Sequence, residues 1–209
     1  MIRRINRKFF FDQCRQTLFT GKLSQAQVNG LNFILDVWEN SHAKKDDRWL
    51  AYALGTAFHE TAFTMQPIRE YGGKDYFFRM YDPESPLPKR AALAKKMHAL
   101  PGDGRVFYGR GYVQLTWRIN YAKMGKTFGV DLTTNAAAAD KVLQADLAAK
   151  IMFKGMEAGD FTGKKFADYF NPQTGDWKNA RRIINGLDCA EIIAAYARKF
   201  YAAVSYTVG

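Results

Sequence analysis

Two glutamates have the surroundings that acid–base chemistry requires, and the first of them is Glu60. It follows an apolar run over residues 49–58 in which large side chains lie at helical spacing on both sides. A helix that is apolar on both sides belongs in a protein core. A carboxyl group at its end borders a medium of low dielectric, which favours the neutral form, so we expect Glu60 to keep a proton that it can donate. The simpler alternative is that Glu60 only marks the solvent-facing end of the helix.

The second glutamate, Glu70, lies in the polar, glycine-containing segment 68–73, where we expect its carboxylate to stay charged beside Arg69. Glycosidases use two carboxyl groups in unlike environments. A helix end and a loop can hold them about 6.5–9.5 Å apart, which admits a water in an inverting mechanism. Simpler roles are expected for three other glutamates: exposed helix positions for Glu39 and Glu157, and a favourable place in a first helical turn for Glu191.

The pair His59-Glu60 also raises the question of a zinc protease. That motif needs a second histidine four residues after the first, and this position is Phe63. The three histidines are scattered along the chain, so we predict neither a metal nor another cofactor and expect His59 to be structural.

A second stretch, residues 108–121, mixes aromatic rings with amides and hydroxyls around Gly109-Arg110-Gly111. It lacks the lysine and hydroxyl ending of a phosphate-binding loop. Flat apolar faces stack on sugar rings, and amides pair with hydroxyl and acetamido groups, so the composition indicates a carbohydrate site. An ordinary buried turn would have a similar composition.

Strong helical patterns dominate the chain and strand patterns are few, so the predicted fold class is mainly α. Ser24 is an expected helix N-cap, and Asp46 or Asp47 is expected to cap the central helix that ends in Glu60. Residues 68–88 contain three prolines and a Gly-Gly pair and are predicted to be an irregular aromatic loop. Helices are expected at residues 9–18, 89–100, 119–128, 136–157 and 189–204, the last burying Ile192 among others, with an extended segment at 107–117.

The net charge of +11 and the pI near 9.6 indicate an anionic partner: nucleic acid, an anionic membrane surface or an acidic cell-wall polymer. The remaining alternative is a basic non-enzymatic binder of nucleic acid or membrane, and against it the basic residues form no dense run or nucleic-acid motif. No stretch reaches the length of a membrane span or of a signal h-region. Cys14 and Cys189 lie far apart and are expected to be buried thiols.

These motifs occur in a familiar order. His59-Glu60-Thr61 precedes Glu70-Tyr71-Gly72 and the stretch from Tyr108 to Trp117, and Ile183-Ile184-Asn185-Gly186 and Arg198-Lys199-Phe200-Tyr201 follow. The chain thereby resembles family-19 glycoside hydrolases, which include plant chitinases and phage endolysins of the lysozyme superfamily, and the endolysins most of all. The resemblance implies a lysozyme-like helical fold with little β structure and a substrate groove between two lobes. It also implies a single catalytic domain over residues 1–209, with a smaller lobe at roughly 68–105 and no separate cell-wall-binding module.

The resemblance assigns a role to individual positions. Glu60 matches the general acid, Glu70 the general base, and Thr116 the hydroxyl residue that helps hold the attacking water. Residues matching or expected to form the substrate-binding set are Tyr108, Gln114, Trp117, Asn120 and Asn185, and Arg198 matches an arginine that orients the second carboxylate. The spacing from Glu60 to Glu70 is shorter than in plant chitinases, and the disulfides of those enzymes have no counterpart here.

We therefore predict an inverting endolysin that cuts the β-1,4 bond between N-acetylmuramic acid and N-acetylglucosamine in peptidoglycan. A chitinase is the alternative with the same chemistry. The expected partner is the glycan strand, with no nucleic acid and no stable membrane insertion, and the chain is expected to be a monomer. The family also implies synthesis in a host cytoplasm and dependence on a separate holin-type pore to reach the periplasm.

Overall fold

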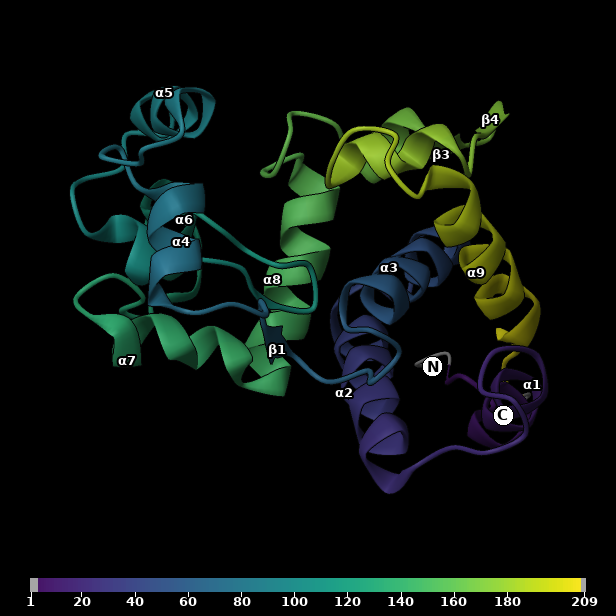
Figure 1. Ribbon diagram of the computed structural model, residues 1–209. Coiled ribbons are helices and arrows are strands. Elements are labelled where there is room, and N and C mark those ends of the chain that lie inside the picture. The colour runs from purple at the N-terminus through teal and green to yellow at the C-terminus, as the bar shows by residue number, and fades with distance from the viewer. Residues whose placement is uncertain (1–3, 208–209) are drawn as a thin grey trace. The chain divides into compact units, whose positions relative to one another are not determined.

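The computed structural model describes residues 4–207, which form two compact units (Figure 1). Unit 1 comprises the chain up to Gln66 and the chain from Ala149 onward, and unit 2 comprises Pro67–Ala148. Most of the described residues are helical, so the prediction of a mainly α protein is confirmed. No helix within residues 4–207 has the length and apolar character needed to cross a membrane.

Unit 1 is built on the packing of α3 against α9. Its α-helices are α1 (Arg7–Thr17), α2 (Gln25–Ser41), α3 (Asp47–Glu60), the end of α8 (Ala145–Ala158) and α9 (Ala190–Ala203). The two central helices approach closely at Gly55, where an added Cβ would lie 2.8 Å from the backbone nitrogen of Ala197. A larger residue at position 55 would therefore force α3 and α9 apart.

The start of each early helix in unit 1 follows from its capping residue. Ser24 accepts from the backbone nitrogen of Gln27 and the Gln27 side chain accepts from Ser24, which together form the capping box of α2. Asp46 accepts from Arg48 at the start of α3. Both caps agree with the sequence analysis. Residues 50–58 of α3 are all buried, as expected for a helix that is apolar on both sides.

The remainder of unit 1 consists of short elements between α8 and α9. They are the 3-10 helices η3 (Phe166–Asp168) and η4 (Asn179–Ile183) and an antiparallel hairpin of β3 (Phe170–Asn171) and β4 (Thr174–Gly175). Arg48 of α3 donates to the carbonyl oxygens of Asn171 and Thr174, which ties the hairpin to the central helix.

Unit 2 is organised around an antiparallel pair of two-residue strands, β1 (Ile68–Arg69) and β2 (Arg110–Gly111). Its other elements are α4 (Lys74–Tyr81), α5 (Pro88–Lys96), η1 (Asp103–Arg105), α6 (Arg118–Phe128), α7 (Ala136–Asp140) and η2 (Lys141–Leu143). This unit reaches well beyond the lobe of roughly residues 68–105 suggested by the sequence, because β2 packs against η2 and Arg110 is tied to Asp140.

Two expected elements differ from the structure. Residues 68–88 are not a continuous loop, because α4 forms in the aromatic part of this segment and packs against η1 and α5. The helix expected at 136–157 is interrupted by η2 and by Gln144, whose backbone is extended. In this region η2 packs against β2, where Gly111 has a φ of +87° and an added Cβ would lie 3.1 Å from the Val142 side chain.

Four side chains were also misplaced by the sequence analysis. Glu39 is buried, because its carboxylate accepts from the backbone nitrogen of Ile5 and from Arg4 and Arg7. Glu157 is only partly exposed and pairs with Lys45. Ile192 is exposed, since Ile193 occupies the inner face of α9. Cys14 is buried as expected, but Cys189 is exposed at the N-terminal end of α9.

Candidate active site

Glu60 lies at the last position of α3, and its side chain is 17% exposed. Its carboxylate accepts a hydrogen bond from the Arg181 guanidinium at 2.6 Å. Arg181 lies on η4, is 4% exposed, and donates from its Nε to the carbonyl oxygen of Asp188 at 3.0 Å. Because the guanidinium is buried and is also held by the Asp188 carbonyl oxygen, it holds the carboxylate of Glu60 in one place.

Arg181 was not predicted from the sequence to be a site residue. It is 121 residues from Glu60 along the chain, and no local pattern distinguishes it from Arg182, which is exposed. The arginine that was singled out, Arg198, is exposed on α9 with its guanidinium 6.0 Å from the centre of the Trp177 ring. Within unit 1 it is therefore Arg181, and not Arg198, that contacts Glu60, and the role of Arg198 at the second carboxylate stays a prediction.

The backbone turns sharply immediately after Glu60. Ala62, Phe63 and Met65 all have positive φ angles, a conformation that costs a non-glycine residue of order 1–3 kcal/mol and is found where surrounding contacts enforce it. The buried Thr61 hydroxyl supplies such contacts: it donates to the carbonyl oxygen of Ala57 and accepts from the backbone nitrogen of Met65. The end of α3 is thus fixed from both sides.

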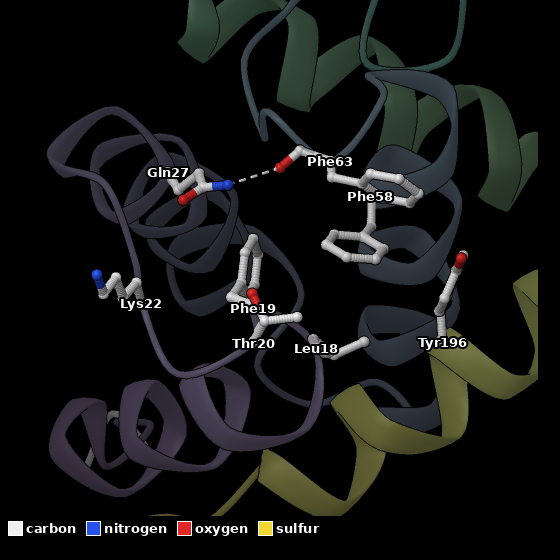
Figure 2. A pocket seen from close by; sticks show the side chains of 8 residues that line it. All are labelled: Leu18, Phe19, Thr20, Lys22, Gln27, Phe58, Phe63 and Tyr196. Carbon is white, nitrogen blue, oxygen red and sulfur yellow. Dashed lines mark hydrogen bonds between the residues drawn. The ribbon is translucent and has the colours of Figure 1, made fainter.

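An aromatic pocket of about 410 Å³ lies beside this turn (Figure 2). Phe58, which precedes Glu60 in the sequence, and Phe63, which follows it, both line this pocket. Phe19 and Tyr196 line it as well. At its rim the Gln27 amide donates to the carbonyl oxygen of Phe63 at 3.0 Å, as Figure 2 shows. None of the residues predicted to bind substrate lines this pocket, so it is separate from the predicted site.

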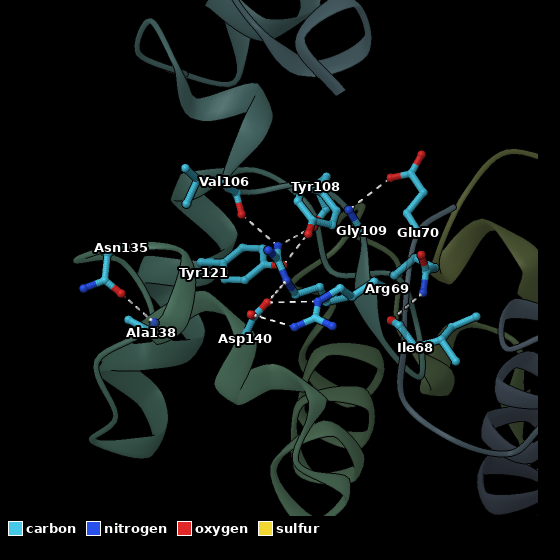
Figure 3. A network of polar contacts seen from close by, with 12 residues as sticks. Ile68, Arg69, Glu70, Val106, Tyr108, Gly109, Tyr121, Asn135, Ala138 and Asp140 are labelled. Carbon is cyan, nitrogen blue, oxygen red and sulfur yellow. Dashed lines mark hydrogen bonds and ion pairs between the residues drawn. The ribbon is translucent and has the colours of Figure 1, made fainter. Parts of the chain in front are cut away.

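Glu70 follows β1 in unit 2 and is hydrogen-bonded to Gly109, which directly precedes β2. Its backbone nitrogen donates to the carbonyl oxygen of Gly109 at 2.8 Å, and the Gly109 nitrogen donates back to the Glu70 carboxylate at 3.1 Å (Figure 3). An added Cβ at Gly109 would lie 2.7 Å from the Gln114 side-chain oxygen and 3.0 Å from Glu70 Oε2. Position 109 must therefore be glycine for the carboxylate and the amide to flank it.

Two tyrosines of α4 complete the surroundings of the Glu70 carboxylate. The Tyr81 hydroxyl lies 2.8 Å from both carboxylate oxygens, and the Tyr76 hydroxyl lies 3.2 Å from Oε1. From the sequence, residues 68–88 were predicted to be a loop, and no role was predicted for either tyrosine. Tyr76 and Tyr81 follow Glu70 closely in the sequence, within one aromatic run. This spacing indicates a contact with Glu70 only when residues 74–81 are known to form a helix.

A partly buried ion pair supports the strand next to Glu70 (Figure 3). Arg110 is 1% exposed and donates to Asp140 at 2.8 Å, to the carbonyl oxygens of Val106 and Tyr108, and to the Tyr121 hydroxyl. Asp140 also accepts from Arg69, which immediately precedes Glu70. The central arginine of Tyr108-Gly109-Arg110-Gly111 thus has a structural role, and the two glycines give the backbone its close approaches.

The aromatic residues predicted to bind sugar lie in unit 2 but offer little ring surface. Tyr108 stacks on Phe77 at 3.8 Å, and Arg110 lies 3.9 Å from the centre of the same ring. Both faces of Tyr108 are therefore covered, so stacking of this ring on a sugar is not possible in this arrangement. Trp117 is 9% exposed, with Tyr81 packed edge-on against it at 5.2 Å. Polar contacts by Tyr108 and Trp117 stay predictions.

Of the predicted polar residues of unit 2, Gln114 and Thr116 lie in the loop that leads into α6, and Asn120 lies in the first turn of this helix. Gln114 has a positive φ and donates to the carbonyl oxygens of Gly111 and Ile68, at 3.3 and 3.4 Å. Asn120 donates to the Thr116 carbonyl oxygen at 2.9 Å and so fixes the loop. Within residues 4–207 the Thr116 hydroxyl makes no hydrogen bond. Asn185 lies instead in unit 1, in an exposed turn that its backbone nitrogen ties to the Arg181 carbonyl oxygen.

Comparison with known proteins identifies the family. The model of glycoside hydrolase family 19, described as chitinase class I, matches residues 36–181, well over half of the chain and a range that includes Glu60, Glu70 and Arg181. The chain belongs to glycoside hydrolase family 19. Residues 1–35 and 182–209, which hold Asn185 and Arg198, lie outside the matched range.

Two kinds of relative are similar to this family-19 chain. Endochitinase A2 of Pisum sativum is 31% identical over 91 residues, which is 42% of this chain and only 26% of the plant protein. The structure of chitinase C from Streptomyces griseus HUT6037 superposes with a TM-score of 0.58 at 20% identity, covering 92% of this chain and 74% of that one. A mutant of chitinase C gives a TM-score of 0.57 at 21% identity. These structures show that the chain has the fold of that chitinase.

Proposed function

We propose that this family-19 protein hydrolyses β-1,4 glycosidic bonds with inversion, using Glu60 as the general acid and Glu70 as the general base. The observation that carries the proposal is that both carboxylates are held in place, Glu60 by a buried guanidinium and Glu70 by three neutral donors. Fixed geometry is what lets a side chain act in proton transfer.

In the proposed reaction a proton leaves Glu60 for the glycosidic oxygen as the bond to the anomeric carbon breaks. A water attacks that carbon from the opposite face of the sugar and gives its proton to Glu70. The Thr116 hydroxyl, which has no partner within residues 4–207, helps to hold this water. Gln114, Asn120 and Asn185 supply amides for the hydroxyl and acetamido groups of the sugar.

We propose peptidoglycan as the substrate and the bond between N-acetylmuramic acid and N-acetylglucosamine as the bond that is cut. The net charge of +11 supports this choice, because peptidoglycan and the outer envelope are anionic and chitin is neutral. In that role the chain acts as a phage endolysin that works as a monomer and reaches the periplasm after a separate pore opens the membrane.

A chitinase is the second candidate, and the comparisons favour it specifically. The family description is chitinase class I, and both the plant relative and the structural neighbour are named as chitinases. The chemistry at Glu60 and Glu70 would be the same, so the two candidates differ in substrate alone.

One digestion experiment separates these functions. Purified protein is incubated with peptidoglycan sacculi and, in parallel, with chitin oligosaccharides, and the products are read by mass spectrometry. The proposal predicts soluble muropeptides with N-acetylmuramic acid at the new reducing end. Release of N-acetylglucosamine oligomers with intact sacculi would instead establish the chitinase, and no product from either substrate would refute the hydrolase.

A further inference from the structure

The carboxylate of Glu70 has more donors around it than an exposed loop glutamate needs. Oε1 lies within hydrogen-bond distance of the Tyr76 and Tyr81 hydroxyls, and Oε2 of the Tyr81 hydroxyl and the Gly109 backbone nitrogen. These groups carry three hydrogens in total, one each. A carboxylate has about four acceptor positions. One position therefore stays open, and a base needs one open position to take a proton from water.

Tyr81 decides which oxygen is left open. Its hydroxyl is 2.8 Å from each carboxylate oxygen but has a single hydrogen, so it donates to one of them at a time. The hydroxyl oxygen also has lone pairs. When Glu70 gains a proton, the new O–H can donate to the Tyr81 oxygen while Tyr81 donates to the other carboxyl oxygen, which closes a six-membered ring of two hydrogen bonds.

We propose that Tyr81 is a positioning residue for Glu70 that serves both of its protonation states. Before turnover its hydroxyl donates to the charged carboxylate and leaves one lone pair for the attacking water. After turnover the same hydroxyl accepts from the carboxylic acid, and the proton lost by the water stays on Glu70. This inference rests on the proposed role of Glu70 as the base.

The surroundings keep the Tyr81 hydroxyl protonated, as this role requires. Burial, followed by the negative charge of Glu70, raises the pKa of Tyr81 well above its ordinary value. The same two causes raise the pKa of Tyr76. The groups acting on Tyr81 are Glu70, Tyr76 and Arg90, and only Arg90 acts to lower its pKa.

Packing distinguishes Tyr81 from its two tyrosine neighbours. Tyr81 ends α4 with its ring edge-on against Trp117, so its hydroxyl is held in place. Tyr76 is 42% exposed and its single contact with Glu70 is longer, at 3.2 Å. Tyr71 is 80% exposed and makes no hydrogen bond to Glu70 within residues 4–207. Replacement of each by phenylalanine keeps the ring and removes only the hydroxyl, which gives a graded series.

The test measures kcat and KM of these three variants across pH on the substrate that the wild type hydrolyses. Loss of a hydrogen bond to a charged group predicts that Tyr81→Phe lowers kcat about 10- to 100-fold, with KM within about twofold of the wild type. The acidic limb of the pH profile should move to higher pH, because the carboxylate loses a donor that favours its charged form. Tyr76→Phe should lower kcat less than about fivefold, and Tyr71→Phe should leave kcat unchanged.

A wild-type kcat and pH profile in Tyr81→Phe would overturn the inference. So would an equal loss in Tyr76→Phe, or a loss in Tyr81→Phe with an unmoved acidic limb and a lower melting temperature, which would indicate a structural role only.

A readout without turnover separates this inference from the proposed function. In protein labelled with ¹³C at the tyrosine Cζ, the Tyr81 signal is assigned by its absence in Tyr81→Phe. The Tyr81 hydroxyl donates to the charged Glu70 carboxylate, so Glu70→Gln should change the chemical shift of this signal at neutral pH. An unchanged chemical shift would refute the contact even in an active enzyme, and a changed chemical shift in an inactive protein would refute only the proposed function.

Discussion

The two glutamates that we propose as acid and base are held in contrasting ways. In unit 1, Glu60 ends a buried helix and contacts a guanidinium that is itself buried and tied to the Asp188 carbonyl. In unit 2, Glu70 follows a two-residue strand and, among the described residues, its carboxylate accepts from two tyrosine hydroxyls and a backbone nitrogen, all neutral donors. One carboxylate is fixed by a charged donor and the other by neutral donors, so the two glutamates differ in the partners that hold them.

The largest expected effect comes from replacing each carboxyl group by its amide. Glu60→Gln removes the proton donor but keeps an oxygen that can accept from Arg181, so we expect kcat to fall by about 10³-fold or more in a protein that is still folded. Glu70→Gln should be comparably harmful. Activity is followed by turbidity loss of permeabilised Gram-negative cells, and folding by circular dichroism.

If only one of the two variants is inactive, the role assigned to the other glutamate is wrong or shared with another group. Near-normal lysis by Glu60→Gln would show that the acid is assigned wrongly. A loss of only a few-fold in Glu70→Gln would show that another group, acting through Thr116, prepares the water.

A smaller effect on stability is expected from the ion pair that supports the strand beside Glu70. Asp140→Asn leaves the buried Arg110 without its carboxylate partner, at a cost of about 2–3 kcal/mol of unfolding free energy, less than for a fully buried pair because Asp140 is about one-third exposed. The control is Arg69→Gln, which removes the 53% exposed partner of the same carboxylate and should cost less than about 1 kcal/mol. Urea unfolding measures both.

The pH dependence of this effect has a definite sign. Burial acts to raise the pKa of Asp140, but hydrogen bonds and charges from Arg69 and Arg110 outweigh it, and the pKa lies below its ordinary value. The stabilisation is therefore present above the unfolded pKa of about 3.9 and is lost as pH falls through the folded pKa. A difference between wild type and Asp140→Asn that persists undiminished in acid would contradict the ion pair.

Local features of the site could be predicted from the sequence. The caps at Ser24 and Asp46 depend on contacts within one helical turn, and the burial of α3 on the composition of one segment. The position of Glu60 at the end of α3 follows from the start of the helix at its cap and from the length of its apolar segment. Gly109 and Gly111 were also noted in the sequence. The structure shows that a side chain at either position would lie too close to its neighbours.

Features that depend on distant partners could not be predicted. Arg181 reaches Glu60 from the far part of the chain, and α4 forms against η1 despite a Gly-Gly pair and a run of aromatics typical of a loop. Glu39 is buried because the N-terminal segment brings it a backbone donor and two arginines. Tyr108 lies in a stretch whose composition indicates sugar binding, but Phe77 and Arg110 cover both faces of its ring. In each case tertiary contacts override the local pattern.

The central claim is that Glu60 donates a proton while Glu70 activates a water, and this requires inversion at the anomeric carbon. The most direct test is proton NMR of the first product formed from a β-1,4 oligosaccharide that the protein cleaves, recorded before the product mutarotates. The account predicts the α-anomer as the initial product. An initial β-anomer would contradict it, because retention requires a covalent or substrate-assisted intermediate in place of direct attack by water.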